Sequence, residues 1–167
     1  EHGLTVAACY LTAQLSNRSS ATRAIEQTAR QLLHLVGEKQ AIGPADPMEM
    51  LRSVPAVAAA AWPDRIAMLR QGSEGRYLLA SGRGAMLSVR AGCTGASFLV
   101  ALQVDGGQGA DGLIHQAVSL TDEQLRQAAG HLISKQRLVT WGGAAGRVVA
   151  LEEERIGAVV LSSRQVP

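Results

Sequence analysis

The stretch AVAAAAWPDRIAMLRQGSEGRYLLASGRGAML, residues 56–87, contains the change of pattern that decides the fold. An alanine-rich helical run continues to Trp62 and ends at Pro63, because proline removes a backbone donor and disfavours helical geometry in the residue before it. Short apolar runs separated by glycine-rich turns follow, which is typical of strands. The stretch therefore predicts a helical segment at 1–62 and a β-rich domain at 63–167.

Before this stretch, the sequence predicts three helices. Apolar residues recur at spacings of three and four over 3–15 and again over 25–36, so each segment places them on one helix face. A third helix begins at Asp46-Pro47, because an aspartate followed by a first-turn proline is typical of a helix N-terminus. Pro55 is expected to kink or split this third helix.

After the stretch, alternating apolar and turn-forming residues predict a small barrel. Thr121 followed by Gln124 is a reciprocal cap for one helix interposed among the strands. Strands in series with a single such helix favour an OB-type barrel, so the predicted fold class is α+β, with a helical segment followed by a small OB-like β-barrel. The predicted strands are 65–70, 76–80, 84–89, 96–104, 112–119, 136–141, 146–152 and 157–163.

Length and composition limit the class of protein. The chain has 167 residues, of which 47% are hydrophobic, which is enough to bury a core. No stretch approaches the roughly 20 uninterrupted apolar residues of a membrane span, and the N-terminus lacks a secretory pattern, so we expect a cytoplasmic protein without a membrane partner. The sequence begins with Glu1 inside an apolar-periodic run, from which we expect a piece of a longer chain.

The sequence predicts neither a catalytic residue nor a metal ligand. The glycine-rich runs at 82–84 and 105–109 lack the Lys-Ser/Thr of a phosphate loop and the third glycine of a dinucleotide fingerprint, and are interpreted as turns. The four histidines lack metal-type spacing. Glu152, Glu153 and Glu154 are adjacent, so in a strand they alternate between faces and are expected at a solvated strand end. No enzymatic activity is expected of this chain alone.

Positive charge is concentrated in one short stretch. Lys plus Arg against Asp plus Glu number 5 and 5 in residues 1–62, 5 and 2 in 63–90, and 6 and 7 in 91–167. Arginines on neighbouring strands and turns can form a strip that follows a phosphate backbone, and Tyr77 could add a stacking platform. The simpler alternative is ordinary surface arginines. The five in this stretch are Arg65, Arg70, Arg76, Arg83 and Arg90.

The run PDRIAMLRQGSEGRYLLASGRGAML at 63–87 resembles a signature of the HrpB-type bacterial DEAH-box ATP-dependent helicases. Further segments look like the region after the motor domains of that family, in the same order. Such order across separate segments is more specific than any one motif. These segments are GLTVAACYLTAQLS at 3–16, AAAAWPDRIA at 58–67, HQAVSL at 115–120 and VTWGGAAGRVVALEEERIGAVVLSS at 139–163.

The resemblance implies a helical, ratchet-like helicase-associated segment at 1–62 joined to an OB-type domain at 63–167. It also implies motor domains as a partner, with ATP and Mg²⁺ bound there and no cofactor in this chain, which has neither a Gly-Lys-Thr loop nor an Asp-Glu-Ala-His box. Single-stranded nucleic acid, RNA or DNA, is the implied substrate. The basic positions that match the signature, and are therefore predicted to contact nucleic acid, are Arg65, Arg70, Arg76 and Arg83.

Two departures from the family pattern bear on these expectations. Glu152 and Glu153 stand where the family often has arginines, and carboxylates there would repel phosphate. The segment after Ser16 is also shorter than the family pattern. The sequence thus leaves two hypotheses: an accessory region that guides single-stranded nucleic acid, and a protein-interaction or regulatory module in which the arginines pair with a protein partner.

Overall fold

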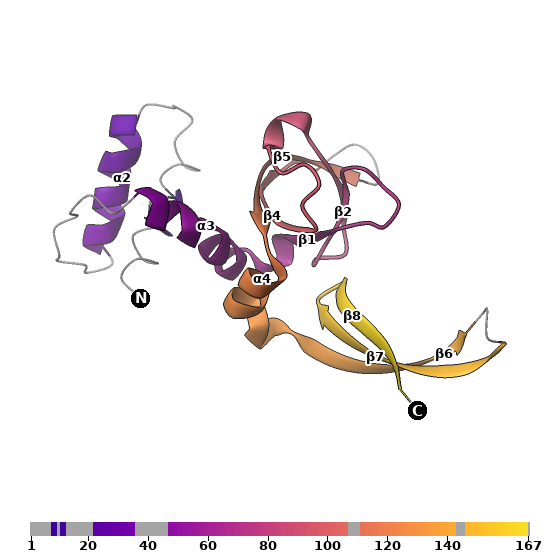
Figure 1. Cartoon of the computed structure of the whole chain (residues 1–167). Helices are drawn as coiled ribbons and strands as arrows, with labels where there is room; N and C mark the ends of the chain where they lie inside the picture. Colours follow the sequence, from indigo (N-terminus) through magenta and orange to yellow (C-terminus); the bar gives the residue numbers. More distant parts are fainter. Residues whose placement is uncertain are drawn as a thin grey trace.

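The computed structural model describes residues 8–9, 11–12, 22–35, 47–106, 111–142 and 146–166. They form helices, a closed five-stranded barrel and a separate three-stranded sheet, which confirms the predicted α+β class (Figure 1). The helices are α2 Thr22–Leu35, α3 Pro47–Ala61 and α4 Asp122–Ala129; the strands are β1 Ile66–Leu69, β2 Arg76–Leu79, β3 Gly84–Leu87, β4 Phe98–Val104, β5 Asp111–Leu120, β6 Ser134–Gly142, β7 Arg147–Ile156 and β8 Val159–Val166.

Two of the three predicted N-terminal helices lie among the described residues. α3 begins at Pro47, as expected of a first-turn proline, and runs to Ala61 with Pro55 inside it, so Pro55 does not split the helix. Asp46, its predicted cap, lies outside the described residues. Of the helix predicted at 3–15, residues 8–9 and 11–12 are described, and they are helical.

The barrel has the strand order β1-β2-β3-β5-β4 and closes through the pairing of β1 with β4. All neighbouring strands are antiparallel except β3 and β5, which are parallel. Glycine turns join the first strands: Gly72 and Gly75 between β1 and β2, and Gly82 between β2 and β3, all have positive φ, which residues with a Cβ rarely adopt. The interpretation of 82–84 as a turn is therefore confirmed.

Alternation along the barrel strands sends side chains to two separate cores. The inner core fills the barrel with Ala67, Tyr77, Leu79, Ala85, Leu99, Ala101 and Ile114. The outer core lies between the barrel wall, α3, α4 and the β7–β8 turn, and includes Ala58, Ala59, Ile66, Ala80, Val100, Leu120, Leu125, Ala129, Ile156 and Val159. Helix α3 thus shares a core with the barrel. Pro63, where the sequence changes from a helical to a strand pattern, lies beside that core.

Helix α4 separates the barrel from the second sheet. Thr121 caps it as predicted: its hydroxyl accepts from the Gln124 amide at 3.1 Å, and the Gln124 side chain accepts from the Thr121 amide at 3.0 Å. The last three strands then form a sheet of order β6-β7-β8. The prediction placed these strands in the same compact sheet or barrel as the others, and the structure corrects this.

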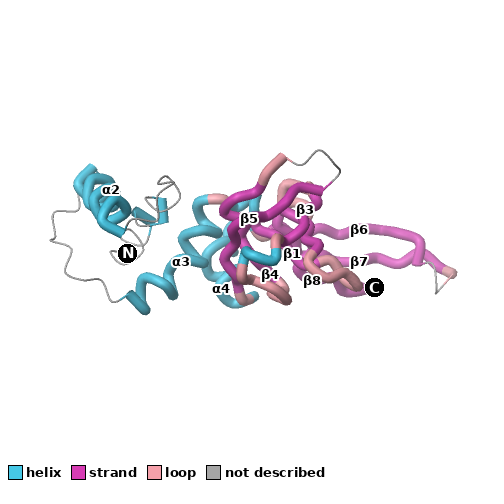
Figure 2. The backbone as a smooth tube through the Cα atoms, turned by 90° about the horizontal axis from the view of Figure 1, so that it is seen from above, coloured by secondary structure: helices cyan, strands magenta, loops and turns pink. Residues whose placement is uncertain are grey.

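The second sheet is joined to the barrel at its base and extends away from it, as both views show (Figures 1 and 2). At the base, the Ala158 amide donates to the Ala80 carbonyl at 2.9 Å. Gly157 has φ 54°, and a Cβ added there would collide with the Ala80 carbonyl. The tight β7–β8 turn therefore lies directly against the end of β2.

None of the described helices has both the length and the apolar character needed to cross a membrane. The division of the chain at residue 62 stays a prediction.

Candidate nucleic-acid interface

The four predicted arginines lie as two pairs at opposite ends of the β1–β2 hairpin. Arg70 follows β1 and Arg76 opens β2, and the Arg70 amide donates to the Arg76 carbonyl at 2.9 Å. Both residues are exposed, and neither side chain makes an ion pair or hydrogen bond with any other described residue. Their guanidinium groups are therefore available to an external anion.

Arg65 and Arg83 lie at the other end of these strands, about 16 Å away along β1 by strand rise. Arg65 Nη1 donates to the Leu102 carbonyl at 3.0 Å, and Arg83 Nη2 donates to the Gly106 carbonyl at 3.1 Å. Together with Asp64, both line a hollow of about 260 Å³. These two arginines support local backbone structure, so the structure does not bring all four guanidinium groups together.

The outward side of the barrel around Arg70 and Arg76 is here called the arginine face. The strand registers place Met86 beside Arg76 and Leu113 beside Met86, with 42% of Met86 and 36% of Leu113 exposed. The side chains of Arg70 and Asp111 both cover Gly84, so one carboxylate lies near Arg70. The arginine face comprises Met68, Arg70, Arg76, Leu78, Gly84, Met86, Asp111 and Leu113.

Tyr77 does not belong to this face, which corrects its interpretation as a stacking platform. It is fully buried inside the barrel, and its hydroxyl donates to the Ala96 carbonyl at 2.8 Å. Burial, and to a lesser extent the nearby Cys93, raise the pKa of the Tyr77 phenol. Strict alternation explains the placement, because Arg76 and Leu78 on either side of Tyr77 point outward.

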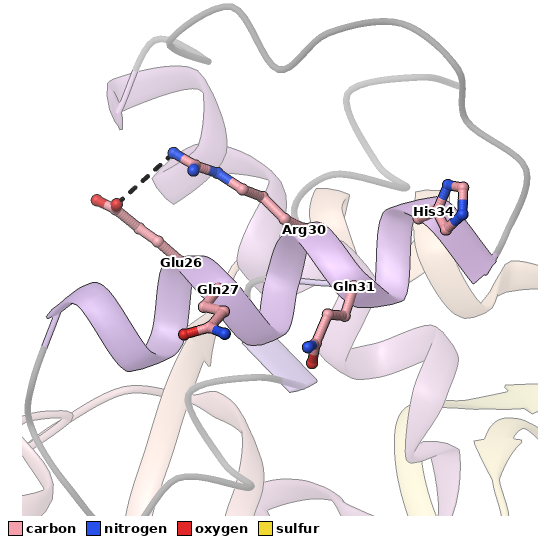
Figure 3. A pocket seen from close by; sticks show the side chains of 5 residues that line it. All are labelled: Glu26, Gln27, Arg30, Gln31 and His34. Atoms are coloured by element: carbon pink, nitrogen blue, oxygen red, sulfur yellow. Dashed lines mark ion pairs between the residues drawn. The ribbon is translucent and has the colours of Figure 1, made fainter.

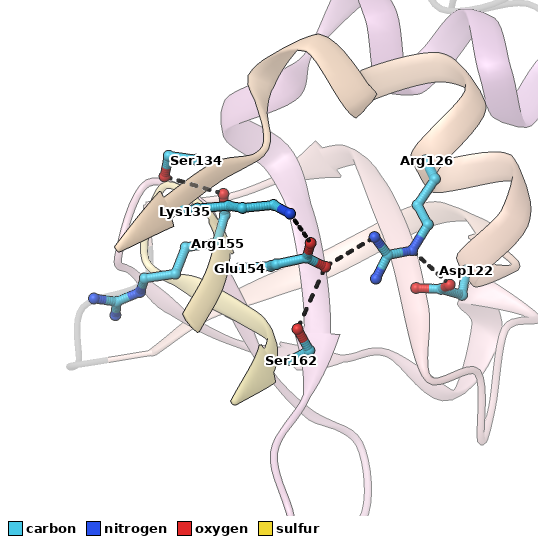
Figure 4. Close-up of polar contacts among 7 residues, drawn as sticks. All are labelled: Asp122, Arg126, Ser134, Lys135, Glu154, Arg155 and Ser162. Atoms are coloured by element: carbon cyan, nitrogen blue, oxygen red, sulfur yellow. Dashed lines mark hydrogen bonds and ion pairs between the residues drawn. The ribbon is translucent and has the colours of Figure 1, made fainter. Parts of the chain in front are cut away.

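The glutamates of β7 form ion pairs in the middle of a sheet, whereas the sequence predicted a solvated strand end. Glu154 contacts Arg126 of α4 at 3.0 Å and Lys135 of β6 at 3.5 Å, and accepts a hydrogen bond from Ser162 at 3.3 Å (Figure 4). Arg126, followed by Lys135, lowers the pKa of the Glu154 carboxyl.

Glu152 and Glu153 are also paired. Glu152 forms an ion pair with Arg164 of β8, and Glu153 lies 3.7 Å from Nε of Arg155 on the other face. Their charges are therefore compensated by neighbouring arginines, which reduces the repulsion of phosphate that their sequence positions suggested.

Helix α2 carries a second hollow, lined by polar side chains (Figure 3). Glu26 and Arg30 form an ion pair at 3.9 Å on one side of the helix, while Gln27 and Gln31 point to another. These side chains do not converge on a common point. Across the part of the chain that the structure describes, no group of three or more His, Cys, Asp or Glu side chains could hold a metal ion.

Sequence reasoning missed the apolar members of the arginine face. Met86 and Leu113 belong to it because β3 and β5 pair in parallel. This pairing joins residues far apart in the sequence, so no local motif predicts it. Alternation around Tyr77 was a usable signal, since it predicts that Arg76 and Leu78 share a face opposite to the tyrosine ring.

Comparison with known proteins gave consistent relatives. No family model matches the chain. It is 34% identical over 104 residues to the ATP-dependent RNA helicase HrpB of Escherichia coli strain K12, a match that covers 62% of this chain and 13% of that protein. A crystal structure of E. coli DExH-box NTPase HrpB matches 97% of this chain with a TM-score of 0.79 and 26% identity.

A second crystal structure, of E. coli DEAH/RHA helicase HrpB, matches 96% of the chain with a TM-score of 0.77 and 24% identity, and this match concerns the fold. The chain spans 21% of each of these two solved chains. Nearly all of the present chain thus has a structural counterpart within a much longer protein.

Proposed function

We propose that this chain, which is similar to part of HrpB helicases in sequence and in fold, is an accessory region that guides single-stranded nucleic acid. In this proposal the arginine face of the OB-like barrel supplies phosphate contacts, and the segment packs on motor domains of the same protein. Such a protein would act in the cytoplasm and hydrolyse ATP with Mg²⁺ in those motor domains, since this sequence has no phosphate loop.

The observation that supports this proposal is the Arg70–Arg76 pair. Two exposed guanidinium groups on directly hydrogen-bonded residues place adjacent positive charges on one face. Side chains opposite one another in an antiparallel pair lie about 5 Å apart at Cβ, which suits contacts to neighbouring phosphates. Arg65 and Arg83 are proposed as weaker contributors, because their guanidinium groups already donate to backbone carbonyls.

The proposal is tested by titrating a labelled single-stranded oligonucleotide with the chain at low salt. Neutralising the pair, Arg70→Gln with Arg76→Gln, is expected to weaken binding at least about tenfold, because hydrogen bonds to charged groups contribute about 1.5–3 kcal/mol each. The slope of log affinity against log salt should become shallower by about 1.4, or about 0.7 per lost phosphate contact.

The matched control is Arg52→Gln, which removes an exposed arginine from α3, away from the arginine face. It should change the affinity less than twofold, about 0.4 kcal/mol. Equal binding by the wild type and the double variant would contradict the proposal.

A protein-interaction module is the second candidate, favoured by the exposed Met86 and Leu113 beside the arginines. Mixed arginine and methionine surfaces are common in protein interfaces. If the double variant Arg70→Gln with Arg76→Gln left oligonucleotide affinity unchanged, while Met86→Ser abolished association with a purified protein partner other than the motor domains, this second function would be preferred.

A further inference from the structure

The hollow beside Arg65 and Arg83 has a lining of mixed polarity. It is here called the barrel-end hollow, because it lies where β1 begins and where the β2–β3 turn meets the end of β4 and the start of β5. Its volume is about 260 Å³, and its polar side chains are those of Asp64, Arg65, Ser81 and Arg83. One carboxylate and one hydroxyl therefore share this hollow with two guanidinium groups.

Asp64 and Ser81 lie side by side at the rim of the barrel-end hollow. The Ser81 amide donates to the Asp64 carbonyl at 3.0 Å, so the two side chains begin at neighbouring points. Both residues are exposed, and neither side chain has a hydrogen bond or ion pair with another described residue. The carboxylate is therefore available to accept a hydrogen bond from a ligand, and the hydroxyl is available to donate one.

The barrel-end hollow is continuous with the arginine face. Gly84 is buried, lines the hollow and also belongs to that face. The side chains of Arg70 and Asp111 lie against it, and Nη2 of Arg70 is 3.0 Å from the position that a Cβ would take at Gly84. A strand of nucleic acid that contacts Arg70 thus has the hollow as its next contact on the barrel.

The charges of the barrel-end hollow suit a ligand that carries both an anion and a hydrogen-bond donor. A carboxylate repels phosphate, so Asp64 is unsuited to a site for phosphate alone. The donor beside the phosphates of a nucleic acid is the ribose 2′-hydroxyl, which DNA lacks. Bases also carry donors, but proteins commonly hold unstacked bases on aromatic rings, and none of the described residues that line the hollow is aromatic.

We infer that the barrel-end hollow binds a ribose of single-stranded RNA, whose 2′-hydroxyl donates to the Asp64 carboxylate and accepts from the Ser81 hydroxyl. Arg65 and Arg83 contact the flanking phosphates. Each uses an N–H group to donate to a backbone carbonyl and keeps further N–H groups for a ligand. This inference rests on the proposed function, and it makes Asp64 the residue that determines a preference for RNA over DNA.

Oligouridine and oligodeoxyuridine of equal length test the inference, because they differ in the 2′-hydroxyl alone. Each labelled oligonucleotide is titrated with the 167-residue chain at low salt. Oligouridine should bind at least about tenfold more tightly, because a hydrogen bond to a charged group is among the stronger ones. Oligouridine with 2′-O-methyl groups keeps the oxygen but lacks the donor, and should bind as weakly as the deoxy form.

The variant Asp64→Ala separates the hydrogen bond from the charge. Removal of a negative charge favours the binding of any polyanion, so charge alone would raise the affinity for both oligonucleotides. A lost contact to the 2′-hydroxyl should instead lower oligouridine affinity at least about fivefold without lowering oligodeoxyuridine affinity. Glu74→Ala is the matched control: it removes an exposed carboxylate between β1 and β2, outside the hollow, and should leave the ratio of the two affinities unchanged.

A free nucleotide has the same ribose and phosphate chemistry as a strand. Uridine 5′-monophosphate should displace oligouridine only at much higher concentration, because a single nucleotide does not reach both the hollow and the arginine face. Displacement at concentrations similar to that of the oligonucleotide would overturn the assignment of the hollow to a strand.

The ribose contact and the arginine face fail in distinguishable ways. Equal wild-type affinity for oligouridine and oligodeoxyuridine would overturn the ribose contact and leave the arginine face intact, since phosphate contacts do not depend on the sugar. Unchanged or higher oligouridine affinity in Asp64→Ala would also overturn the ribose contact. The Arg70 and Arg76 substitutions should weaken both oligonucleotides alike. Absence of any oligonucleotide binding by the wild type would overturn both proposals.

Discussion

The ion pairs of Glu154 give a prediction for the pKa of a single residue. Its carboxylate meets Arg126 and Lys135 from two different elements, and the interaction with Arg126 is the largest cause of its lowered pKa. Arg126→Gln should therefore raise the pKa of Glu154, and Lys135→Gln should raise it less. Carboxyl chemical shifts followed by NMR through an acid titration measure both.

The same pair fixes the direction of a pH effect on stability. Because folding lowers the pKa of Glu154, its stabilising contribution is present above the ordinary value of about 4.3 and is lost as the pH falls through the lowered value. Unfolding by urea at pH 6 and at successively lower pH should show a smaller loss in Arg126→Gln than in the wild type. An equal loss in both would assign the acid sensitivity to other carboxylates.

Tyr77 gives a prediction at alkaline pH. Burial raises the pKa of its phenol, so Tyr77 should ionise above the ordinary value of about 10, and stability should decline as the pH rises through that region. Ultraviolet absorbance of tyrosinate should show one late-titrating tyrosine that disappears in Tyr77→Phe. The chain has one other tyrosine, Tyr10, so the variant is needed to assign the late step to Tyr77.

Single residues show which contacts can be predicted from local sequence and which cannot. The reciprocal cap at Thr121 and Gln124 was predicted from residue type and spacing, because the contact is local. Tyr77 was misinterpreted because residue type alone does not say which side of a strand is buried. The pairing partners of Glu154 come from α4, β6 and β8 and could not be predicted from local sequence.

At the scale of elements, the β7–β8 turn holds the second sheet against the barrel. A side chain at Gly157 would meet the Ala80 carbonyl, whereas Gly146 has a similar φ of 58° with nothing near its Cβ position. Gly146→Ala should cost about 1 kcal/mol, for its backbone conformation alone. Gly157→Ala should cost a further 1–3 kcal/mol, roughly, because the collision adds to that conformational term.

Urea denaturation of the two glycine variants measures this difference, with Gly146→Ala as the matched control. Similar midpoints for both would show that the turn moves away from Ala80 without loss. The hydrogen bond from the Ala158 amide to the Ala80 carbonyl argues against such freedom.

Elements were the level at which sequence reasoning succeeded most. All eight strands and α4 appear close to their predicted positions, because alternation and glycine turns are local signals. The separation of β6–β8 from the barrel was missed, since strand pairing depends on partners far away in sequence. The prediction that Pro55 would split its helix failed in the opposite way: the local rule predicts a break, but α3 continues through Pro55 because it packs against the rest of the molecule.

For the whole molecule, the outer core links the helical and β-rich parts. Ala58 and Ala59 of α3 are fully buried against the barrel side, among residues such as Ile66 and Val100. A chain of residues 63–167 would expose this apolar surface, so it should unfold at lower temperature than a chain of residues 47–167. Calorimetry of the two chains measures the difference, and equal transition temperatures would support an independent domain at 63–167.

Barrel closure also has a consequence for how the chain reaches its fold. β1 must find β4, with Ile66 paired to Val100, and β3 must find β5 in parallel, with Gly84 paired to Asp111. Closing such loops costs chain entropy before the contacts compensate, so proteins rich in distant pairings fold in milliseconds to seconds. During synthesis on a ribosome, the first three strands therefore remain incompletely paired until β5 has emerged.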